Sequence, residues 1–431
     1  MSGSVLIVSH VFPPMAAGGA VRVGQFARYL PSFGWSPTVL TCEVPGSSQI
    51  DTAALRALDP CVQILRAPDP LQGVAPRGAT HVGRGAKGAL RGALKEVARW
   101  SLFPDRQLPW VPGALVAGHK ALRARRHDVV FASYGPASNL IVGAALAQEH
   151  ALPLVVDFRD LWSDLPRPVF ASSAHRRAAS WLEGHIVRRA SRVTAVSEGM
   201  AQHLERRHGG KDASAAGKFV SIPNGYDPDD VARVVDRRDG EPRPFHLVYA
   251  GSSHEHYDLG PFWHALRELR DAGRIRAESF RVSFVGAMPV DDARSYGVAE
   301  LVEVHPFVPH AEVFNHLARA DAMLMLETPG YYRQMGSAVK VFDYLLTGKP
   351  VLALIEEGGP SARLLSAAGT GYVADPRKAE EIGKALLGLL GEKGLSPRAV
   401  NLSHSPFAEY DRVALTRALA AILDATVRQA G

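Results

Sequence analysis

Short runs of β-branched and aliphatic residues alternate with longer amphipathic stretches along the chain. The first run, Val5–Ser9, is followed by a loop rich in Pro and Gly and then by a helical stretch at Val21–Leu30. This order of strand, loop and helix is typical of parallel sheets with crossover helices. The same pattern predicts further strands at Thr38–Thr41, Asp128–Ala132, Leu154–Phe158, Val193–Val196 and Phe219–Ile222, and helices that include Asn139–Gln148 and Arg176–Ala190.

The alternation of strand and helix patterns starts again at Phe245–Ala250, which is followed by Gly251 and two serines. The polar segment Asn224–Arg243 separates the two series and is typical of a linker. The second series predicts strands at Arg281–Val285, Leu301–Val304, Ala322–Leu326, Pro350–Leu354 and Gly371–Val373. We therefore predict an α/β protein with two Rossmann-like domains, residues 1–226 and 227–404. An amphipathic helix in residues 405–431 either packs back on the first domain or stands as a plain terminal helix.

Length and composition agree with this class. A chain of 431 residues suits two domains, and 46% hydrophobic with 21% charged residues is the composition of a soluble globular protein. The two cysteines, Cys42 and Cys61, exclude a disulfide framework and fit a reducing compartment. No run of about 18 apolar residues occurs, and the first ten residues lack the basic flank of a signal peptide. We therefore expect a cytoplasmic protein, and the net charge of +6 does not by itself point to nucleic acid.

Positive charge is concentrated in residues 77–106, where there is little acid. Within this region Gly88–Trp100 has apolar residues at helical spacing. The stretch fits a solvated surface helix, and it also fits an interfacial helix that contacts anionic lipid or a lipid-linked substrate. Both interpretations stay open, and the second implies peripheral contact with the inner face of a membrane.

The loop Phe12–Arg22 lies between the first strand and its helix. Its glycines, Gly18 and Gly19, let a ligand approach the backbone, and free N–H groups at a helix start favour a phosphate. A tight turn that needs glycine explains the same residues equally well. The loop does not match G-x-G-x-x-G, which leaves a nicotinamide dehydrogenase as a weak third alternative. Arg22 would add charge to this pocket.

Three charged residues, Asp157, Arg159 and Asp160, come at the carboxyl end of a strand, where open α/β sheets bind ligands. They can serve as base, substrate anchor or electrostatic stabiliser. The alternative is a capping turn with a local Arg–Asp pair. Nearby, Ser197 suits the N-cap of the following helix, and the Asn224-Gly225 turn is either structural or ligand-facing.

The segment with the most candidate ligand-binding residues is Tyr331–Pro350. We expect a loop that ends at Gly336 and a helix that begins at Ser337, whose N–H groups can hold a diphosphate. Lys340 in the first turn adds a point charge, and Asp343 one turn later can accept hydrogen bonds from two ribose hydroxyls. The alternative is an exposed Lys–Asp pair on a surface helix.

No metal site is expected. The acidic segment Asp227–Asp230 superficially matches a metal-binding carboxylate pair, but it lies in the linker and suits the first turn of a helix. No group of His, Cys or Glu has metal-ligand spacing.

Taken together, these residues resemble the retaining, family-four type of glycosyltransferases with the two-Rossmann GT-B architecture, especially bacterial members that build polysaccharides or glycosylated natural products. The segments that carry the resemblance are Phe12–Arg22, Pro104–Arg106 with Trp110, Asp157–Asp160, Val193–Ser197, Pro223–Gly225, Tyr249–Gly251, Phe307–Pro309 and Lys340–Pro350.

The resemblance implies a nucleoside-diphosphate sugar bound in a cleft between the two domains, mainly by the second, with no divalent metal and with retention at the anomeric carbon. The diphosphate would meet the N–H groups around Gly336–Lys340, Asp343 the ribose, and Phe307 and Val308 the base, while Gly18 and Gly19 close from the first domain. The expected donor residues are Gly18, Gly19, Arg22, Gly251, Phe307, Val308, Arg333, Gly336, Ser337, Lys340 and Asp343. The expected catalytic residues are Asp157, Arg159 and Asp160.

This chain departs from the family pattern in three places. The first acid of the usual pair is replaced by Met335, and Arg159 stands where many members carry a His. The usual Arg and Lys clamp after the first strand of the second domain is replaced by a segment with His254 and His256, so Arg333 or Lys340 would supply that charge.

Two alternative functions therefore stay open, a sugar-nucleotide epimerase of the same architecture and a non-catalytic nucleotide-binding relative. The acceptor can be a small molecule, a saccharide or a lipid-linked molecule.

Overall fold

The computed structural model consists of two compact units. It describes residues 3–16, 18–44, 46, 49–71, 102–164, 170–209, 217–231, 233, 243–251, 257–286, 292–330, 339–391 and 407–430. The first unit comprises Met1–Ile222 with Thr416–Gly431, and the second comprises Pro223–Leu415. The basic stretch Gly88–Trp100, which the sequence predicts as a helix, lies outside the described residues.

The first unit is built on a seven-stranded sheet in the order β3-β2-β1-β4-β5-β6-β7. Every neighbouring pair is parallel. Its strands are β1 (Gly3–Val8), β2 (Trp35–Cys42), β3 (Gln63–Ala67), β4 (Val129–Ser133), β5 (Leu154–Phe158), β6 (Arg192–Ala195) and β7 (Phe219–Ser221). Strand β3 is not predicted by the hydrophobic pattern, because this edge strand is mostly half-buried and mixes polar with apolar residues.

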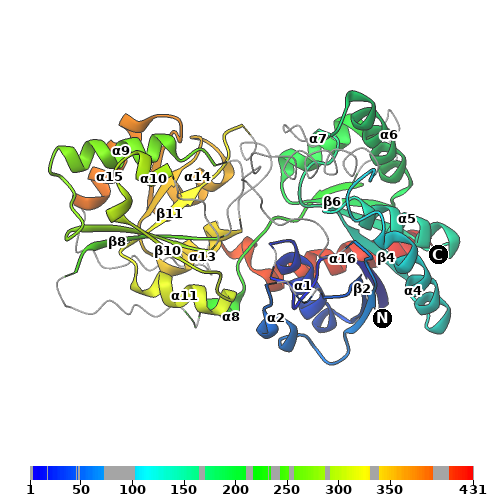
Figure 1. The fold of residues 1–431 in the computed structure, drawn as a ribbon. Coiled ribbons are helices and arrows are strands. Elements are labelled where there is room, and N and C mark those ends of the chain that lie inside the picture. Colours follow the sequence, from blue (N-terminus) through cyan, green and yellow to red (C-terminus); the bar gives the residue numbers. More distant parts are fainter. Residues whose placement is uncertain are drawn as a thin grey trace. The chain divides into compact units, whose positions relative to one another are not determined.

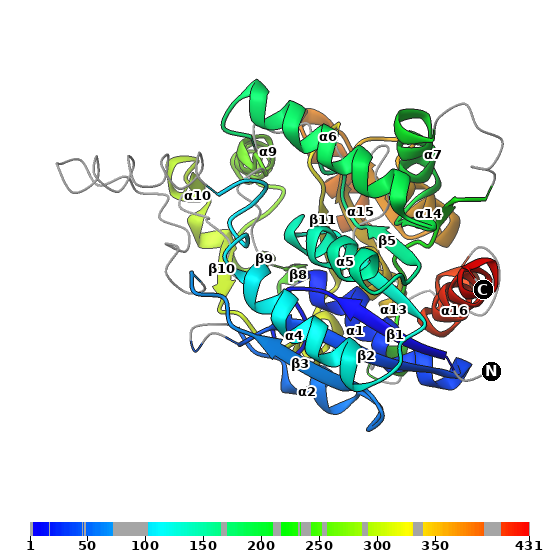
Figure 2. The ribbon, with the colours of Figure 1, turned by 90° about the vertical axis from the view of Figure 1, so that its right-hand side faces the viewer.

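The helices of the first unit follow its strands in the expected alternation. They are α1 (Gly18–Tyr29), the 3-10 turn η1 (Leu30–Phe33), α2 (Thr52–Arg56), α4 (Trp110–Ala124), α5 (Ser138–Glu149), α6 (Ser173–Arg189) and α7 (Glu198–His208). Helices α4 and α5 pack side by side, α4 against β2 and β3 and α5 against β4 (Figure 2). Ser197 caps α7, as predicted, because its hydroxyl accepts a hydrogen bond from the Met200 N–H at 3.1 Å.

The second unit repeats the same plan. Its six-stranded sheet has the order β10-β9-β8-β11-β12-β13 and is parallel throughout. The strands are β8 (Phe245–Ala250), β9 (Phe280–Val285), β10 (Val302–His305), β11 (Ala322–Leu326), β12 (Val351–Leu354) and β13 (Gly371–Ala374). The predicted α/β class with two Rossmann-like sheets is confirmed.

Both faces of this second sheet are covered, so its strands alternate between two apolar cores. Leu247 and Tyr249 of β8 belong to the core under α9 (Gly260–Asp271) and α15 (Ala379–Gly391). Val248 belongs to the core under α11 (His310–Arg319), α13 (Lys340–Thr347) and α14 (Pro360–Ala368). Figure 1 shows α9 and α15 on one side of β8 and α11 and α13 on the other. The helices of this unit are α8 (Pro228–Val231), α9 (Gly260–Asp271), α10 (Asp292–Ser295), η3 (Ala299–Leu301), α11 (His310–Arg319), α13 (Lys340–Thr347), α14 (Pro360–Ala368) and α15 (Ala379–Gly391).

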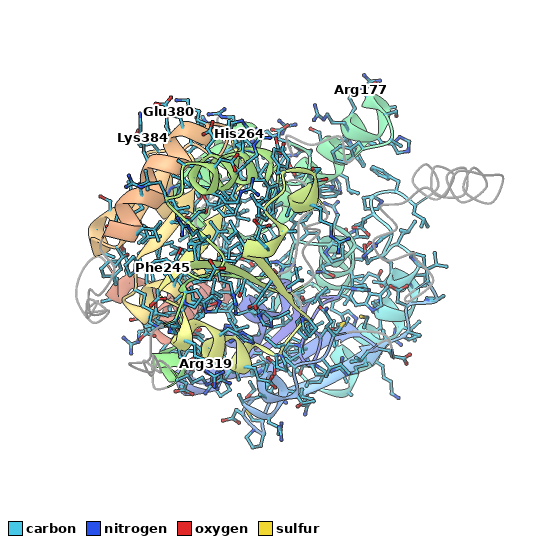
Figure 3. The ribbon with its side chains drawn as sticks, turned by 60° about the vertical axis from the view of Figure 1, so that its left-hand side comes forward. Arg177, Phe245, His264, Arg319, Glu380 and Lys384 are labelled. Atoms are coloured by element: carbon cyan, nitrogen blue, oxygen red, sulfur yellow. The ribbon has the colours of Figure 1, made fainter. Side chains whose placement is uncertain are left out.

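The outer surface of α15 is polar. Glu380 and Lys384 point away from the sheet and form an ion pair one turn apart, with 2.6 Å between the charged atoms (Figure 3). An exposed pair of this kind contributes little to stability.

The chain returns to the first unit at its end. After the 3-10 turn η4 (Ala408–Tyr410), helix α16 (Arg412–Ala430) begins in the second unit, and its residues from Thr416 onward belong to the first. The Arg417 guanidinium lies 5.4 Å from the Phe33 ring centroid, and Arg192 donates a hydrogen bond to Gln429 at 2.7 Å. Among the helices of the described segments, none combines the length and the apolar character that a membrane span needs.

The Asn224-Gly225 turn has a structural role. Gly225 lies so close to the Tyr410 carbonyl that a β-carbon at this position would collide with the backbone. Just beyond it, Tyr226 and Asp411 form a parallel bridge, in which the Tyr226 N–H donates to the Tyr410 carbonyl at 3.0 Å. The turn therefore packs against the segment Tyr410–Asp411, and this contact requires glycine at position 225.

Candidate functional site

Both sheets reverse their strand order once, and open α/β sheets bind ligands at the carboxyl ends of the strands beside such a reversal. In the first unit the reversal lies between β1 and β4, and in the second between β8 and β11. The residues that follow β8 and β11, together with the start of α13, therefore form the candidate donor site.

Lys340, the first residue of α13, reaches the end of β8. Its Nζ donates a hydrogen bond to the Tyr249 hydroxyl at 2.7 Å and lies 4.0 Å from the centroid of that ring. Burial lowers the pKa of Lys340 to about 7, although Asp343 and Glu327 favour the charged form. The sequence analysis left open an exposed Lys–Asp surface pair, whereas the structure turns the ammonium toward β8.

Gly251 makes room for this lysine. Its φ is +146°, and a β-carbon there would lie 2.7 Å from the Lys340 Nζ. Any other residue would be strained and would displace the ammonium. The expected site residues Gly251 and Lys340 are therefore brought together at the end of β8, immediately before the position of the missing clamp.

Tyr344 anchors α13 against the same strand ends. Its hydroxyl accepts a hydrogen bond from the Ala250 N–H at 3.0 Å and donates one to the Leu324 carbonyl at 3.1 Å. Burial raises the pKa of Tyr344 well above its usual value, so the hydroxyl remains protonated and keeps its donor role. Because Tyr344 holds α13 in place, it also determines the position of the Asp343 backbone, which precedes it in the helix.

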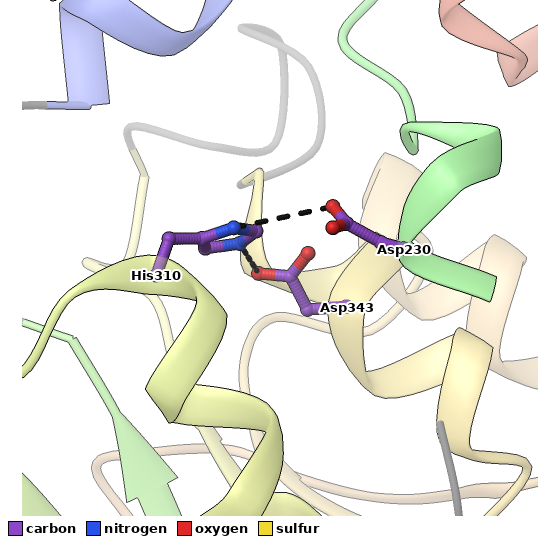
Figure 4. Close-up of side chains that lie close together, drawn as sticks. All are labelled: Asp230, His310 and Asp343. Carbon is purple, nitrogen blue, oxygen red and sulfur yellow. Dashed lines mark hydrogen bonds and ion pairs between the residues drawn. The ribbon is translucent and has the colours of Figure 1, made fainter. Parts of the chain in front are cut away.

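Asp343 faces two residues from other elements (Figure 4). The His310 Nε2 lies 3.3 Å from one Asp343 oxygen, and the His310 Nδ1 lies 3.9 Å from an oxygen of Asp230. Asp230 is buried and accepts a hydrogen bond from Arg233 at 2.5 Å. Burial raises the pKa of Asp230 to about 6, against the opposing effect of His310.

Sequence reasoning missed Asp230 and His310. Asp230 was set aside with the acidic segment 227–230, of which Asp229 and Asp230 lie in the first turn of α8 as expected and Asp227 precedes it. In the part of the chain that the structure describes, Asp230, His310 and Asp343 are the one group whose possible ligand atoms all lie within 4.8 Å of one another, the separation at which they could hold a metal ion. No sequence spacing identifies this group, because its members come from three separate helices.

The remaining expected donor residues are only partly described. Phe307 and Val308 are half-buried immediately before α11, and Val308 packs against the core beneath that helix. They therefore lie two or three residues from His310 in the chain. Arg333, Gly336 and Ser337 lie outside the described residues. Helix α13 begins at Lys340, after a turn at Val339, and not at the expected Ser337.

In the first unit, Arg22 and Asp157 form a buried ion pair. The Arg22 Nη2 and Nε donate to the two Asp157 oxygens at 2.8 and 3.1 Å. Ser133 and Thr194 add hydroxyl hydrogen bonds to the same carboxylate at 2.9 and 2.8 Å. Burial alone would raise the pKa of Asp157, but Arg22 and the two hydroxyls lower it overall. With both oxygens engaged and no exposed surface, Asp157 is arranged to hold Arg22 and not to accept a substrate proton.

Arg159 supports the start of α1. Its Nε donates to the Tyr134 carbonyl at 2.8 Å and its Nη2 to the Gly135 carbonyl. A β-carbon at Gly19 would collide with the Arg159 guanidinium, whereas Gly18 has open space around it. Asp160 is exposed beside Arg159 and raises the pKa of that guanidinium against the larger lowering effect of burial. The first-domain loop and the charged segment after β5 thus meet, as expected for one site.

A histidine that the sequence analysis did not single out lies at the end of β1. The His10 Nε2 lies 2.9 Å from an Asp69 oxygen, and its ring packs edge-on against Trp110 with 5.2 Å between centroids. Asp105, which the family resemblance included, caps α5 by accepting hydrogen bonds from the N–H and hydroxyl of Ser138. Asp105 and Trp110 therefore lie near the carboxyl end of the first sheet, on the same side as His10.

Two family models match consecutive parts of the chain. Residues 17–225 match the glycosyl transferase 4-like domain, and residues 244–392 match the glycosyl transferases group 1 domain. The structure divides into its two units between Ile222 and Pro223, three residues before the first match ends. No curated protein sequence matches the chain.

Solved structures of similar fold span the whole chain at low sequence identity. Sucrose-phosphate synthase from Thermosynechococcus elongatus is 14% identical, with a TM-score of 0.60 over 100% of this chain and 97% of that one. HepE from Anabaena, solved in complex with UDP, is 16% identical, with a TM-score of 0.54 over 100% and 98% of the two chains. A putative UDP-N-acetylglucosamine 2-epimerase from Listeria monocytogenes is 13% identical, with a TM-score of 0.55 over 100% and 98%.

The likeness to a synthase and to an epimerase shows the fold alone, because both identities are below 25%. The family models distinguish between the activities, since both describe glycosyl transferases and together they cover both units. With its two parallel-sheet units and these paired domains, the chain belongs to the glycosyltransferases of the GT-B fold.

Proposed function

We propose that the protein transfers a sugar from a nucleoside-diphosphate sugar to an acceptor hydroxyl, with retention of the anomeric configuration and without a divalent metal. The observation that carries this proposal is the position of Lys340, whose ammonium group occupies the space left by Gly251 at the end of β8. Asp343 lies one turn further along the same helix. One cation and one carboxylate are thus spaced for a phosphate and a ribose.

The diphosphate would bind near Lys340, the first residue of α13. When the bond between the sugar and the diphosphate breaks, negative charge develops on the leaving phosphate, and a fixed ammonium group stabilises that charge. Lys340 would in this way replace the cationic clamp that the chain lacks after β8. Arg333, the other candidate for this role, lies outside the described residues.

The nucleoside would bind along α13 and the segment before α11. Asp343 would accept hydrogen bonds from the ribose hydroxyls, and the base would lie against Phe307 and Val308. The fold likeness to a protein solved with UDP makes uridine diphosphate the first nucleotide to test.

The acceptor side belongs to the first unit. Arg159 and Asp160 stand at the carboxyl end of β5, beside Gly19, where they can contact the reacting sugar or the acceptor. Asp157 holds Arg22 in place instead of reacting itself. The acceptor is a small molecule, a saccharide or a lipid-linked molecule, and no nucleic acid is involved. A cytoplasmic location with contact at the inner face of a membrane stays a prediction.

A thermal-shift screen with uridine, guanosine, thymidine and adenosine diphosphates tests the donor class. We expect at least one to raise the melting temperature, because a ligand that binds only the folded state stabilises it by mass action. The shift should persist in EDTA if no metal takes part. If none of the four stabilises the protein, the proposal is wrong.

Turnover then separates a transferase from an epimerase. A donor sugar incubated alone should keep its configuration at every ring carbon, and transfer should begin only when an acceptor is added. NMR of the product should show the same anomeric configuration as the donor. Conversion of the sugar nucleotide without an acceptor would instead identify an epimerase.

A further inference from the structure

The ribose-binding role proposed for Asp343 leaves two neighbours unexplained, His310 and Asp230. The three side chains come from α13, α11 and α8, and all three face one another within the second unit (Figure 4). Asp230 is buried, His310 is partly exposed, and Asp343 is intermediate. A buried carboxylate beside an accessible histidine calls for a physical role, because desolvating a charge is costly unless it is paired.

The imidazole ring has a carboxylate next to each of its two nitrogens, which places it for two ionic contacts. His310 uses its Nε2 toward Asp343, at 3.3 Å, and its Nδ1 toward Asp230, at 3.9 Å. One atom from each of the three side chains also lies within 4.8 Å of the others, so the same group could hold a metal ion, and removal of metal by EDTA tests that alternative. A carboxylate accepts hydrogen bonds, so each ring nitrogen must carry a hydrogen to interact favourably with the oxygen that it faces.

We propose that Asp230 and His310 are positioning residues that orient the Asp343 carboxylate for the ribose of the donor. Asp230 attracts one nitrogen of the imidazole ring, and the other nitrogen donates to one Asp343 oxygen. The second Asp343 oxygen is then directed toward the ribose hydroxyls. This inference rests on the proposed nucleoside-diphosphate donor and names the residues that determine how its sugar is recognised.

Asp230 is itself held in place by its surroundings. Arg233 donates to one of its oxygens at 2.5 Å, and Asp227, immediately before α8, accepts a hydrogen bond from the Asp229 N–H at 3.0 Å. The carboxylate therefore approaches His310 from a segment that is fixed by local hydrogen bonds. A contact held on both sides restricts rotation of the imidazole ring.

Two histidine variants distinguish the roles of the two ring nitrogens. The amide nitrogen of Gln can occupy roughly the position of Nε2, whereas that of the shorter Asn corresponds to Nδ1. His310→Gln should therefore keep a donor for Asp343, and His310→Asn should lose it. The measured quantity is the ratio of affinities for UDP and 2′,3′-dideoxy-UDP, since phosphate and base contacts cancel in this ratio. If the screen above favours another base, its own pair of nucleotides replaces these two.

Wild-type protein should prefer UDP by about 10–100-fold, the effect of leaving hydrogen-bonding groups of a site unpaired. His310→Gln should retain most of this preference, and His310→Asn should reduce it to about threefold or less. Asp230→Ala should weaken the preference in the same direction, with Asp230→Asn, which keeps an acceptor oxygen, closer to wild type. These two variants provide the measurement if His310→Asn does not fold.

Each alternative outcome contradicts the proposal in a recognisable way. Unchanged preference in His310→Asn and Asp230→Ala would remove both residues from ribose recognition. Equal loss of affinity for both nucleotides would indicate a structural role only. Loss of the preference in wild-type protein on addition of EDTA would point to a metal ion held by the three residues. If no nucleoside diphosphate binds at all, the proposed function itself fails, which is a distinct result.

Discussion

Lys340 illustrates how burial can tune a single side chain for anion binding. Its ammonium lies against the Tyr249 ring and hydroxyl, and burial lowers its pKa to about 7. A bound diphosphate would favour the charged form again. Near neutral pH, Lys340 is therefore protonated in only part of the free protein, and binding of the donor would favour protonation of the rest.

This lowered pKa predicts that donor binding weakens with rising pH. Above pH 7 the free protein has lost the Lys340 proton, so binding must take up a proton, and the dissociation constant for UDP should rise by up to about tenfold per pH unit. Isothermal titration at pH 7, 8 and 9 measures this dependence. Lys340→Gln should bind more weakly at pH 7 and show a flat profile.

Lys384 on α15 provides a matched control, because it is exposed and pairs with Glu380 (Figure 3). Lys384→Gln should reproduce the wild-type pH profile. A wild-type dissociation constant that does not change between pH 7 and 9 would show that Lys340 does not hold the diphosphate.

Asp343 gives a second prediction at the residue scale. Asp343→Ala should weaken nucleoside-diphosphate binding by about 1–3 kcal/mol, the scale of lost buried hydrogen bonds. The same titration, at pH 7, measures the change, with the melting temperature of the variant as a check on folding. An unchanged affinity would remove Asp343 from the ribose.

At the scale of elements, the Arg22–Asp157 pair joins helix α1 to the centre of the first sheet. Asp157 is the penultimate residue of β5 and also accepts hydrogen bonds from β4 and β6, through Ser133 and Thr194. The pair therefore determines where the Gly18–Gly19 helix start lies relative to Arg159. Its contribution to function is through this placement.

Arg22→Met should lower the free energy of unfolding by about 3–5 kcal/mol, because it leaves a buried carboxylate without its cation. Urea denaturation measures the loss. Adding Asp157→Asn to this variant should recover part of the stability, since a neutral amide costs less to bury than an unpaired charge. If the double variant is no more stable than Arg22→Met, the Asp157 charge is not the cause.

Elements whose buried residues form apolar runs could be predicted from the sequence, and contacts between distant elements could not. Strands β5, β8 and β11 have the predicted bounds, because parallel strands covered on both faces are continuously hydrophobic. Edge strand β3 lacks such a run and was missed. The charges after β5 were correctly placed at a strand end, yet sequence could not show that Asp157 is buried against Arg22. His310 and Asp230 meet Asp343 only through the tertiary fold.

At the scale of the whole molecule, the last helix belongs with the first unit. Leu419 and Leu423 of α16 are fully buried, and the contacts of residues 416–430 lie mainly within the unit that contains β1 to β7. This helix therefore supplies part of the core of a unit whose other residues precede Pro223.

Leu419→Ala should destabilise the first unit selectively, by about 2–5 kcal/mol for a fully buried leucine. Hydrogen exchange measured by mass spectrometry should become faster in peptides from residues 3–222 and stay unchanged in those from residues 243–391. Equal acceleration in both sets would show that α16 stabilises the two units together.

The position of α16 also affects how the protein can fold during synthesis. Domains usually fold in the order in which they leave the ribosome. Here the segment from Thr416 onward is translated after the whole of the second unit. The first unit therefore lacks its last helix at a stage when every residue of the second unit has been synthesised. Until then, the apolar surface that Leu419 and Leu423 cover is open to chaperones in the nascent chain.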